Sequence, residues 1–337
     1  GRGYAHADGG CIRMADIDAR RLKVYFRPEN HIVIFDFDNG KIIQKIGFCA
    51  RLLLIFARLD KKQEKMLLFP NCKINIGLDI LRRRPDGFHD IETVMYPVMG
   101  LCDGLEMIHS DRAGVQFSGS GLAIGCPPGG NLAVRAYGLM RSRYGISGIK
   151  MHLHKSIPFG AGLGGGSADA AFTIAGLDKL FNLGLPESEL EGLAAELGSD
   201  TAFFIRNTPR FCEGRGEAMS PAHVDLNGKF ILIIKPRAAV STAAAYAGVT
   251  PAIPGESLRE LVGLPMDEWR GKVHNHFEES VFSHYPELAQ IKKAVYDAGA
   301  SYAAMSGSGS AIYGIFVEEP KKLRPTNSIE TQFIFKM

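Results

Sequence analysis

Alternation of apolar and polar positions, interrupted by segments with helix signals, predicts a mixed α/β chain. Residues 149–154 alternate as a strand with one buried face does. Short apolar runs predict further strands over 72–81, 93–98, 104–109, 230–234 and 311–316. Helices are expected over 131–144, where Asn131 is a suitable N-cap, and over 187–197, where Gly198 is a suitable stop. The other segments that suit helices are 167–181, 242–248, 258–262 and 288–298.

The composition of the chain changes twice, which suggests its domain limits. A shift near residues 220–228 predicts an N-terminal domain over 66–224 and a C-terminal domain over 225–337. The first 65 residues do not resemble the rest of the chain, although 31–35 have strand character, and Met66 is a second possible start. We favour the interpretation that residues 1–65 are upstream or non-native sequence; a targeting or accessory segment is the alternative.

Composition indicates an ordinary soluble enzyme-sized protein. The 337 residues are 46% apolar and 22% charged, and the formal net charge of +3 is too small to indicate a nucleic-acid partner. No apolar run reaches the roughly 18 residues of a membrane span; the nearest, 46–57, contains Arg51. Six scattered cysteines without a C-x-x-C pair suggest neither a zinc site nor a disulfide framework. Reduced thiols in the cytoplasm are therefore expected. The sequence leaves the oligomeric state open.

The most informative segment is the glycine-rich run over residues 157–171. Five glycines in seven positions, followed by Ser167 and small residues, predict a loop that opens a helix. Unpaired N–H groups and the positive end of a helix form a cradle for phosphate. The run lacks the lysine of a P-loop, and its extra glycines and internal position argue against a dinucleotide fingerprint. A flexible surface loop is the alternative, but ordering five glycines is costly and a ligand explains them better.

Two charged residues are candidates for catalysis. Lys73 lies within an otherwise apolar strand, where an ammonium group needs a partner; a solvent-facing lysine on an edge strand is the alternative. Asp200 follows Gly198 and suits the N-cap of the next helix. Its functional interpretation is a carboxylate that accepts a hydroxyl proton during phosphoryl transfer. Asp200 is also a candidate partner for Lys73.

Three further patterns have weaker signals. The basic turn Arg84-Pro85-Asp86-Gly87-Phe88-His89 is either a solvated hairpin or a binding loop, with Phe88 stacking on a base and His89 hydrogen-bonding to it. The segment Ser306, Gly307, Ser308, Gly309 and Ser310 is either a turn or a second loop that closes over phosphates. The pairs His152/His154 and His274/His276 have no evident third ligand, so we expect no metal site.

These motifs in this order resemble the GHMP kinase superfamily. Residues 158–171 resemble its central phosphate motif, 73–77 its first motif and 305–310 its last. Within the superfamily the match is closest to the branch that acts on a cytidine-diphosphate-linked methylerythritol. The features that decide this are Lys73-Ile74-Asn75, the segment 84–89, the triple glycine 164–166 and Leu197-Gly198-Ser199-Asp200. The resemblance covers about residues 66–316.

The resemblance implies a fold and an activity. The fold is an α+β/α/β two-domain GHMP kinase fold, with an N-terminal ribosomal-S5-domain-2-like α/β domain and a ferredoxin-like C-terminal domain. The activity is transfer of phosphate from ATP, with Mg²⁺, to the 2-hydroxyl of the small-molecule cytidine diphosphate methylerythritol. Homoserine- or mevalonate-type kinases of the same superfamily are the nearest alternative; a silent nucleotide-binding module and a dehydrogenase are further ones.

The resemblance also implies residue roles. Lys73 and Asp200 would be the catalytic pair, Asn75, Phe88 and His89 would bind the substrate, and the loop of residues 306–309 would lie near the phosphates. Phe88 replaces a tyrosine and Ala168 a serine that many members have. The residues expected to bind ATP are Pro158, Phe159, Gly160, Ala161, Gly162, Leu163, Gly164, Gly165, Gly166, Ser167 and Ala168.

Overall fold

The computed structural model describes residues 22–27, 31–36, 41–47, 55–56 and 65–337, with side-chain contacts from residue 65 onwards. The chain divides into two compact units, one formed mainly by residues 1–50 and the other by residues 51–335. In the first unit, an antiparallel sheet in the order β1-β2-β3 is formed by Leu22–Arg27, His31–Asp36 and Lys41–Gly47. The strand character expected for residues 31–35 is confirmed.

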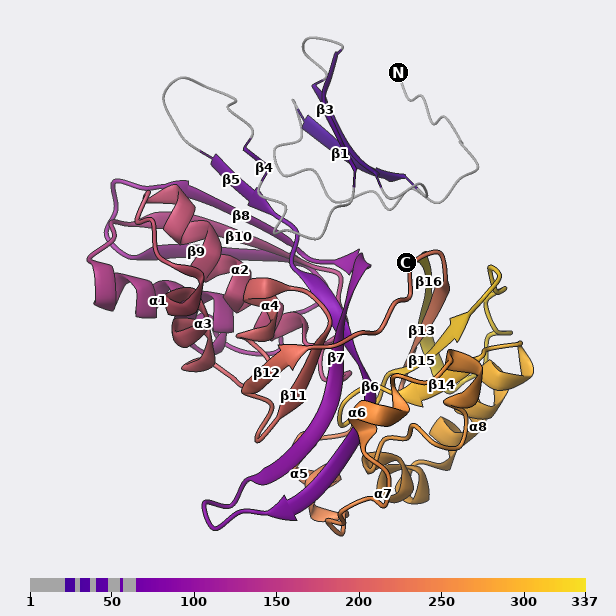
Figure 1. The fold of residues 1–337 in the computed structure, drawn as a ribbon. Coiled ribbons are helices and arrows are strands. Elements are labelled where there is room, and N and C mark those ends of the chain that lie inside the picture. The colour runs from indigo at the N-terminus through magenta and orange to yellow at the C-terminus, as the bar shows by residue number, and fades with distance from the viewer. Residues whose placement is uncertain (1–21, 28–30, 37–40, 48–54, 57–64) are drawn as a thin grey trace. The chain divides into compact units, whose positions relative to one another are not determined.

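Two long paired strands, β6 and β7, run through the second unit (Figure 1). They span Asn71–Arg83 and His89–Cys102, and the first ten residues of β6 are all buried. Their tight turn passes through Gly87, whose φ of 86° favours glycine. β11 (Arg210–Glu213) and β12 (Ala218–Pro221) complete a sheet in the order β12-β11-β7-β6.

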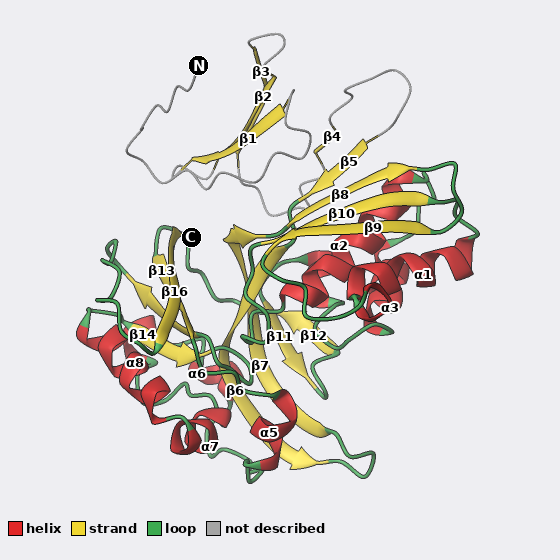
Figure 2. Cartoon of the chain, turned by 180° about the vertical axis from the view of Figure 1, so that it is seen from behind, coloured by secondary structure: helices red, strands yellow, loops and turns green. Residues whose placement is uncertain are grey.

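A second sheet, in the order β4-β5-β8-β10-β9, has helices on one face (Figures 1 and 2). Apolar side chains of β10 that alternate with polar ones pack under these helices, in a core that includes Met151, Leu153 and Phe172. The side chain of Asn131 accepts the N–H of Ala133 and caps α1 as expected. The strands are Ile55–Phe56, Lys65–Leu68, Gly104–His109, Val115–Gly121 and Ile149–Lys155 for β4, β5, β8, β9 and β10, and the helices are Leu132–Tyr144, Gly165–Leu180, Glu187–Ala195 and Phe203–Arg206 for α1 to α4.

A third sheet, in the order β14-β15-β13-β16, belongs to the C-terminal half, and α8 packs against β14 and β15 (Figure 2). Its buried strand β13 begins at the expected Phe230. The hydroxyl of Tyr313 on β15 donates to the carbonyl of Asn75 on β6 at 2.7 Å, which ties this sheet to the long hairpin. The strands are Phe230–Pro236, Tyr302–Met305, Ile312–Phe316 and Ile329–Lys336 for β13 to β16, and the helices are Thr242–Ala247, Leu258–Leu261, Phe277–His284 and Pro286–Asp297 for α5 to α8.

The predicted elements are all present, and the mixed α/β class is confirmed. The main differences are lengths and omissions: β7 is more than twice as long as the predicted 93–98 segment. The strands β1, β3, β4, β5, β9, β11, β12, β14 and β16 and the helix α7 were not predicted. These short elements lack a long periodic pattern, and their formation depends on neighbouring strands.

Candidate functional site

Lys73 and Asp200 form an ion pair between a strand and a turn. The Lys73 side chain is buried in β6, and its Nζ lies 3.3 Å from Asp200 Oδ2. Nζ also donates to Asn75 Oδ1. Asp200 lies between α3 and α4, and one third of its side chain is exposed. The structure therefore brings together the two residues expected to form a catalytic pair.

The structural alternatives for both residues are wrong. α4 begins after Ala202 and has no side-chain cap, so Asp200 is not its N-cap. β6 is an edge strand of its sheet, but Lys73 does not face solvent. The glycine loop covers this edge, because the Lys73 N–H donates to the carbonyl of Leu163 at 2.9 Å.

The glycine-rich segment connects β10 to α2 and has the expected backbone. Gly160, Gly162 and Gly164 have φ values of 58°, 75° and 72°, a region that strains other residues. A Cβ atom on Gly162 would also overlap the carbonyl of Ser306. Gly164 is the N-cap of α2 and provides no side-chain acceptor, so the first N–H groups of the helix suit an anion.

The small-residue loop of residues 306–309 lies against both motifs. The Ser306 hydroxyl accepts the Asn75 N–H at 3.3 Å and donates to the Gly162 carbonyl at 2.8 Å. Asn275 holds the same loop, because its Nδ2 donates to the carbonyls of Met305 and Gly307, each at 2.8 Å. The three segments that carry the family resemblance thus meet at one place. Asn275, which bonds the loop, had no sequence signal beyond its side-chain type.

The residues expected to bind substrate occupy different surroundings. Asn75 is buried between Lys73 and Thr93, whose Oγ1 accepts from Asn75 Nδ2 at 3.1 Å. The His89 ring stacks on Tyr246, with centroids 4.8 Å apart. Burial raises the pKa of Tyr246, and the charge of Asp200 adds to this effect. Phe88 is 54% exposed, and Arg215 lies over its ring at 4.8 Å.

Comparisons with known proteins agree with this geometry. The GHMP kinases N terminal domain matches residues 131–207, and the GHMP kinases C terminal domain matches residues 255–325. A 4-diphosphocytidyl-2-C-methyl-D-erythritol kinase of Parabacteroides distasonis is 44% identical over 271 residues, which cover 80% of this chain and 98% of the relative. One of Bacteroides thetaiotaomicron is 48% identical over 274 residues, with coverage of 80% and 99%. The chain belongs to the GHMP kinase family.

Solved structures place this GHMP kinase in the same fold. A 4-(cytidine 5'-diphospho)-2C-methyl-D-erythritol kinase has a TM-score of 0.61 at 31% identity, covering 74% of this chain and 90% of that one. A homoserine kinase from Cytophaga hutchinsonii has a TM-score of 0.57 at 19% identity, covering 78% and 88%, and shows the shared fold. The expected two-domain kinase fold is confirmed, and the chain is a phosphotransferase.

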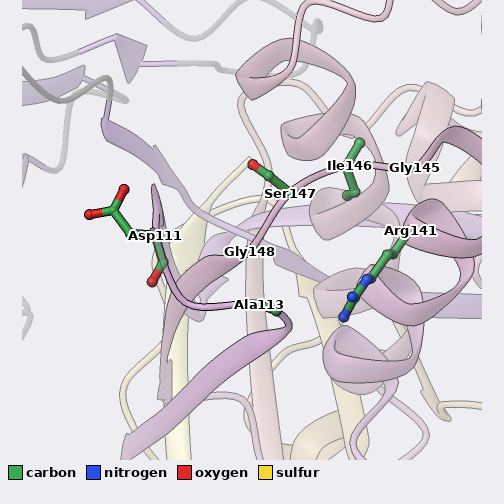
Figure 3. A pocket seen from close by; sticks show the side chains of 8 residues that line it. Asp111, Ala113, Arg141, Gly145, Ile146, Ser147 and Gly148 are labelled. Atoms are coloured by element: carbon green, nitrogen blue, oxygen red, sulfur yellow. The ribbon is translucent and has the colours of Figure 1, made fainter.

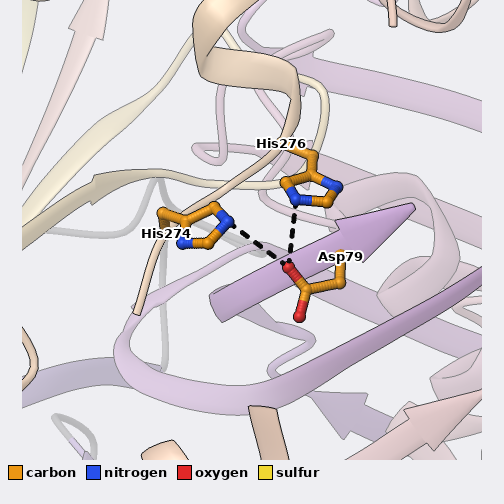
Figure 4. Close-up of side chains that lie close together, drawn as sticks. All are labelled: Asp79, His274 and His276. Carbon is orange, nitrogen blue, oxygen red and sulfur yellow. Dashed lines mark ion pairs between the residues drawn. The ribbon is translucent and has the colours of Figure 1, made fainter. Parts of the chain in front are cut away.

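Asp79 on β6 forms a cluster with His274 and His276, which lie in the segment just before α7 (Figure 4). Asp79 Oδ1 is 3.7 Å from His274 Nε2 and 3.5 Å from His276 Nε2, so the structure supplies the third group that the sequence did not show. His276 Nδ1, however, accepts the Ile80 N–H at 3.0 Å. Its neutral ring therefore carries the proton on Nε2, where a metal would bind. This tautomer favours a hydrogen bond to Asp79 over a three-ligand metal centre.

A hollow of the kinase lies apart from the Lys73–Asp200 pair. It is formed by the turn after β8 and the turn between α1 and β10, and Arg141 extends along one side of it (Figure 3). Neither Lys73 nor Asp200 lines it. The residues that line it are Ser110, Asp111, Ala113, Arg141, Gly145, Ile146, Ser147 and Gly148.

The structure bears on two features that composition raised, membrane-spanning segments and cysteines. No helix within the described residues has the length and apolar character needed to cross a membrane. Cys72, Cys102, Cys126 and Cys212 are free thiols, and Cys11 and Cys49 lie outside the described residues.

Proposed function

We propose that this kinase transfers the terminal phosphate of ATP to the 2-hydroxyl of 4-diphosphocytidyl-2-C-methyl-D-erythritol. The observation that carries the proposal is the Lys73–Asp200 pair beside a glycine loop that ends at a helix N-terminus. Relatives at 44% and 48% identity over nearly their whole length are named for this substrate. ATP use follows from membership of the kinase family.

The proposed chemistry uses each group for one task. Asp200 accepts the proton of the substrate hydroxyl, whose oxygen then attacks the terminal phosphorus, and ADP leaves. Lys73 holds the Asp200 carboxylate in place, and Asn75 in turn holds the Lys73 ammonium. The backbone of residues 158–168 surrounds the phosphates and stabilises their charge.

Magnesium fits this site mainly as a phosphate-bound ion. Asp169, the acid nearest to the loop on α2, is buried and bonded to Lys155, so a hydrated ion has no access to it. Ser167, in the first turn of α2, is partly exposed and offers a hydroxyl oxygen. Mg²⁺ keeps several waters and binds phosphate oxygens readily, so we expect Ser167 and water to complete its ligands, where it would neutralise phosphate charge.

The proposed cytidine contact is the pair of stacked rings at the start of β7. His89 has a hydrogen-bonding edge, and Tyr246 beside it adds an aromatic face. Phe88 offers an exposed ring near the same turn. The domain limits 66–224 and 225–337 and the cytoplasmic location remain predictions that accompany this proposal.

A coupled ADP-release assay tests the proposal. The purified full chain, with Mg²⁺ and ATP, should turn over the cytidine-linked methylerythritol and leave homoserine and mevalonate essentially unused. Preference for homoserine or mevalonate would move the enzyme to the other branch of the family. ATP binding without turnover of any alcohol would reject the kinase assignment of the catalytic pair.

A further inference from the structure

A second lysine with two carboxylates lies beneath the glycine loop. The side chain of Lys155 is 1% exposed, and its Nζ donates to Asp103 and, at 2.7 Å, to Asp169. The Asp103 side chain is fully buried, and the Asp169 side chain is 4% exposed. The proposed chemistry assigns no role to Lys155 or Asp103, and Asp169 is closed to a hydrated ion.

This triad is connected to both ends of the loop. Lys155 is the last residue of β10, which enters the loop, and Asp169 lies in α2, which leaves it. The second oxygen of Asp103, Oδ1, accepts the N–H groups of Ser156 at 2.6 Å and Ile157 at 2.9 Å. One carboxylate therefore fixes both the lysine and the first two peptides of the loop.

The loop also packs directly on the lysine. A Cβ atom on Gly165, the first residue of α2, would lie 3.4 Å from Lys155 Nζ and 2.9 Å from Ile157 Cγ2. The absence of a side chain at this position lets the helix start pack closely on Ile157, next to the ammonium group. A shift of Lys155 would thus move the helix end that we propose to bind phosphate.

The two carboxylates of the triad are not equivalent. Both oxygens of Asp103 accept hydrogen bonds, whereas Asp169 Oδ1 is buried without a hydrogen-bond partner among the described residues. One ammonium cannot neutralise two carboxylates, and an unpaired buried charge is costly. Burial raises the pKa of Asp169 well above its usual range, and the charge of Asp103 adds to this.

We infer that Lys155 and Asp103 are positioning residues that hold the phosphate loop in its binding shape, and that Asp169 accompanies them as a neutral, protonated acid. The inference rests on the proposal that this loop binds the ATP phosphates. It predicts that removing the charge of Asp103 disturbs ATP binding, and that removing the ionisable group of Asp169 does not.

Two isosteric variants of the full chain test this asymmetry on the same lysine. Asp103→Asn should raise KM for ATP about tenfold or more, because a small displacement of a binding loop is costly, with a much smaller change in KM for the cytidine substrate. Asp169→Asn should keep both KM values within about twofold of the wild type. Equal losses in the two variants, or an unchanged KM for ATP in Asp103→Asn, would overturn the inference.

Infrared difference spectra of wild type minus Asp169→Asn at neutral pH provide a readout independent of activity. They should show the carbonyl band of a protonated acid; a carboxylate band instead would overturn the neutral assignment. If Asp103→Asn does not fold, Lys155→Arg, which keeps the charge but adds bulk beside Gly165, should raise KM for ATP selectively. Equal effects on both substrates would reject the positioning role.

Calorimetric binding of MgATP separates this inference from the proposed function. Wild type that binds MgATP but does not use the cytidine substrate would reject the proposed substrate only. The ratio of MgATP dissociation constants between Asp103→Asn and Asp169→Asn, expected to be about ten or more, would still decide the inference.

Discussion

Lys73–Asp200 and Lys155–Asp103 are the same chemical pair in two different surroundings. In the first, the Asp200 side chain is one third exposed and lies 3.3 Å from the lysine. In the second, the lysine is 1% exposed and the carboxylate is fully buried, with N–H groups on its other oxygen. The two carboxylates differ mainly in accessibility. Asp200 can be reached by a substrate and can exchange a proton with it, whereas the buried Asp103 can only make contacts within the protein.

The two lysines lie beside consecutive residues of the glycine-rich segment, Gly164 and Gly165. A Cβ atom on Gly164 would lie 3.0 Å from Lys73 Cγ, and one on Gly165 would lie 3.4 Å from Lys155 Nζ. The end of the loop is therefore packed between Lys73 and Lys155. This arrangement lets one short segment set the distance between the phosphates and the catalytic acid.

Asp200→Asn should abolish most turnover, because it removes the partly exposed carboxylate of the Lys73–Asp200 pair. An amide cannot accept the hydroxyl proton, so we expect kcat to fall about 10²- to 10⁴-fold. The MgATP dissociation constant should stay close to that of the wild type, because the loop backbone is unchanged. Steady-state kinetics and calorimetry measure the two quantities. A variant with normal turnover would remove Asp200 from the mechanism.

Replacing each lysine by methionine should separate the two pairs further. Lys73→Met leaves Asp200 able to reach water, so the fold should persist while kcat falls about 10²-fold or more. Lys155→Met leaves the buried Asp103 charge uncompensated, which should cost about 3–5 kcal/mol of unfolding free energy. Urea unfolding and kcat of both variants provide the measurement. Similar unfolding free energies for the two would show that burial does not distinguish the pairs.

The pairing of Lys73 with Asp200 was predictable from sequence, and the pairing of Lys155 with Asp103 was not recognised. Lys73 stood out as a charge within a continuous apolar strand. Lys155 carried a similar signal, because Ile149, Met151, Leu153 and Lys155 share the inward face of β10. This signal was missed because Lys155 ends its strand, where a lysine commonly reaches solvent. Tyr246 and Asn275 could not be found, since their roles depend on contacts between distant segments.

The proposed binding of the cytidine substrate near the Lys73–Asp200 pair can be tested at His89. His89→Ala removes the ring that stacks on Tyr246, so KM for the cytidine substrate should rise about tenfold. KM for ATP should change by less than about twofold, since His89 is not part of the phosphate loop. Tyr246→Phe, which keeps the stacked ring, is the matched control and should behave nearly as the wild type. An effect confined to ATP would contradict the assignment of His89.

A pH-dependent effect is expected for the stability of the buried triad of Lys155, Asp103 and Asp169. Since the pKa of Asp169 is raised in the folded state, the folded wild type retains a proton that the unfolded chain loses above about pH 4. Wild-type stability should therefore fall as pH rises towards the folded pKa, by up to about 1.4 kcal/mol per pH unit. Asp169→Asn has no ionisable group at this position and does not lose stability in this way. The difference in unfolding free energy, variant minus wild type, should therefore increase from pH 5 to pH 8.

Urea unfolding of the wild type and Asp169→Asn at both pH values measures this difference. Asp111→Asn, which makes the same substitution at an exposed position, is the matched control. A constant difference between wild type and Asp169→Asn, or a variant that loses stability at pH 8, would mean that Asp169 is ionised. Lys155 would then face two charged carboxylates, and burial alone would no longer account for the difference between the Lys155–Asp103 and Lys73–Asp200 pairs.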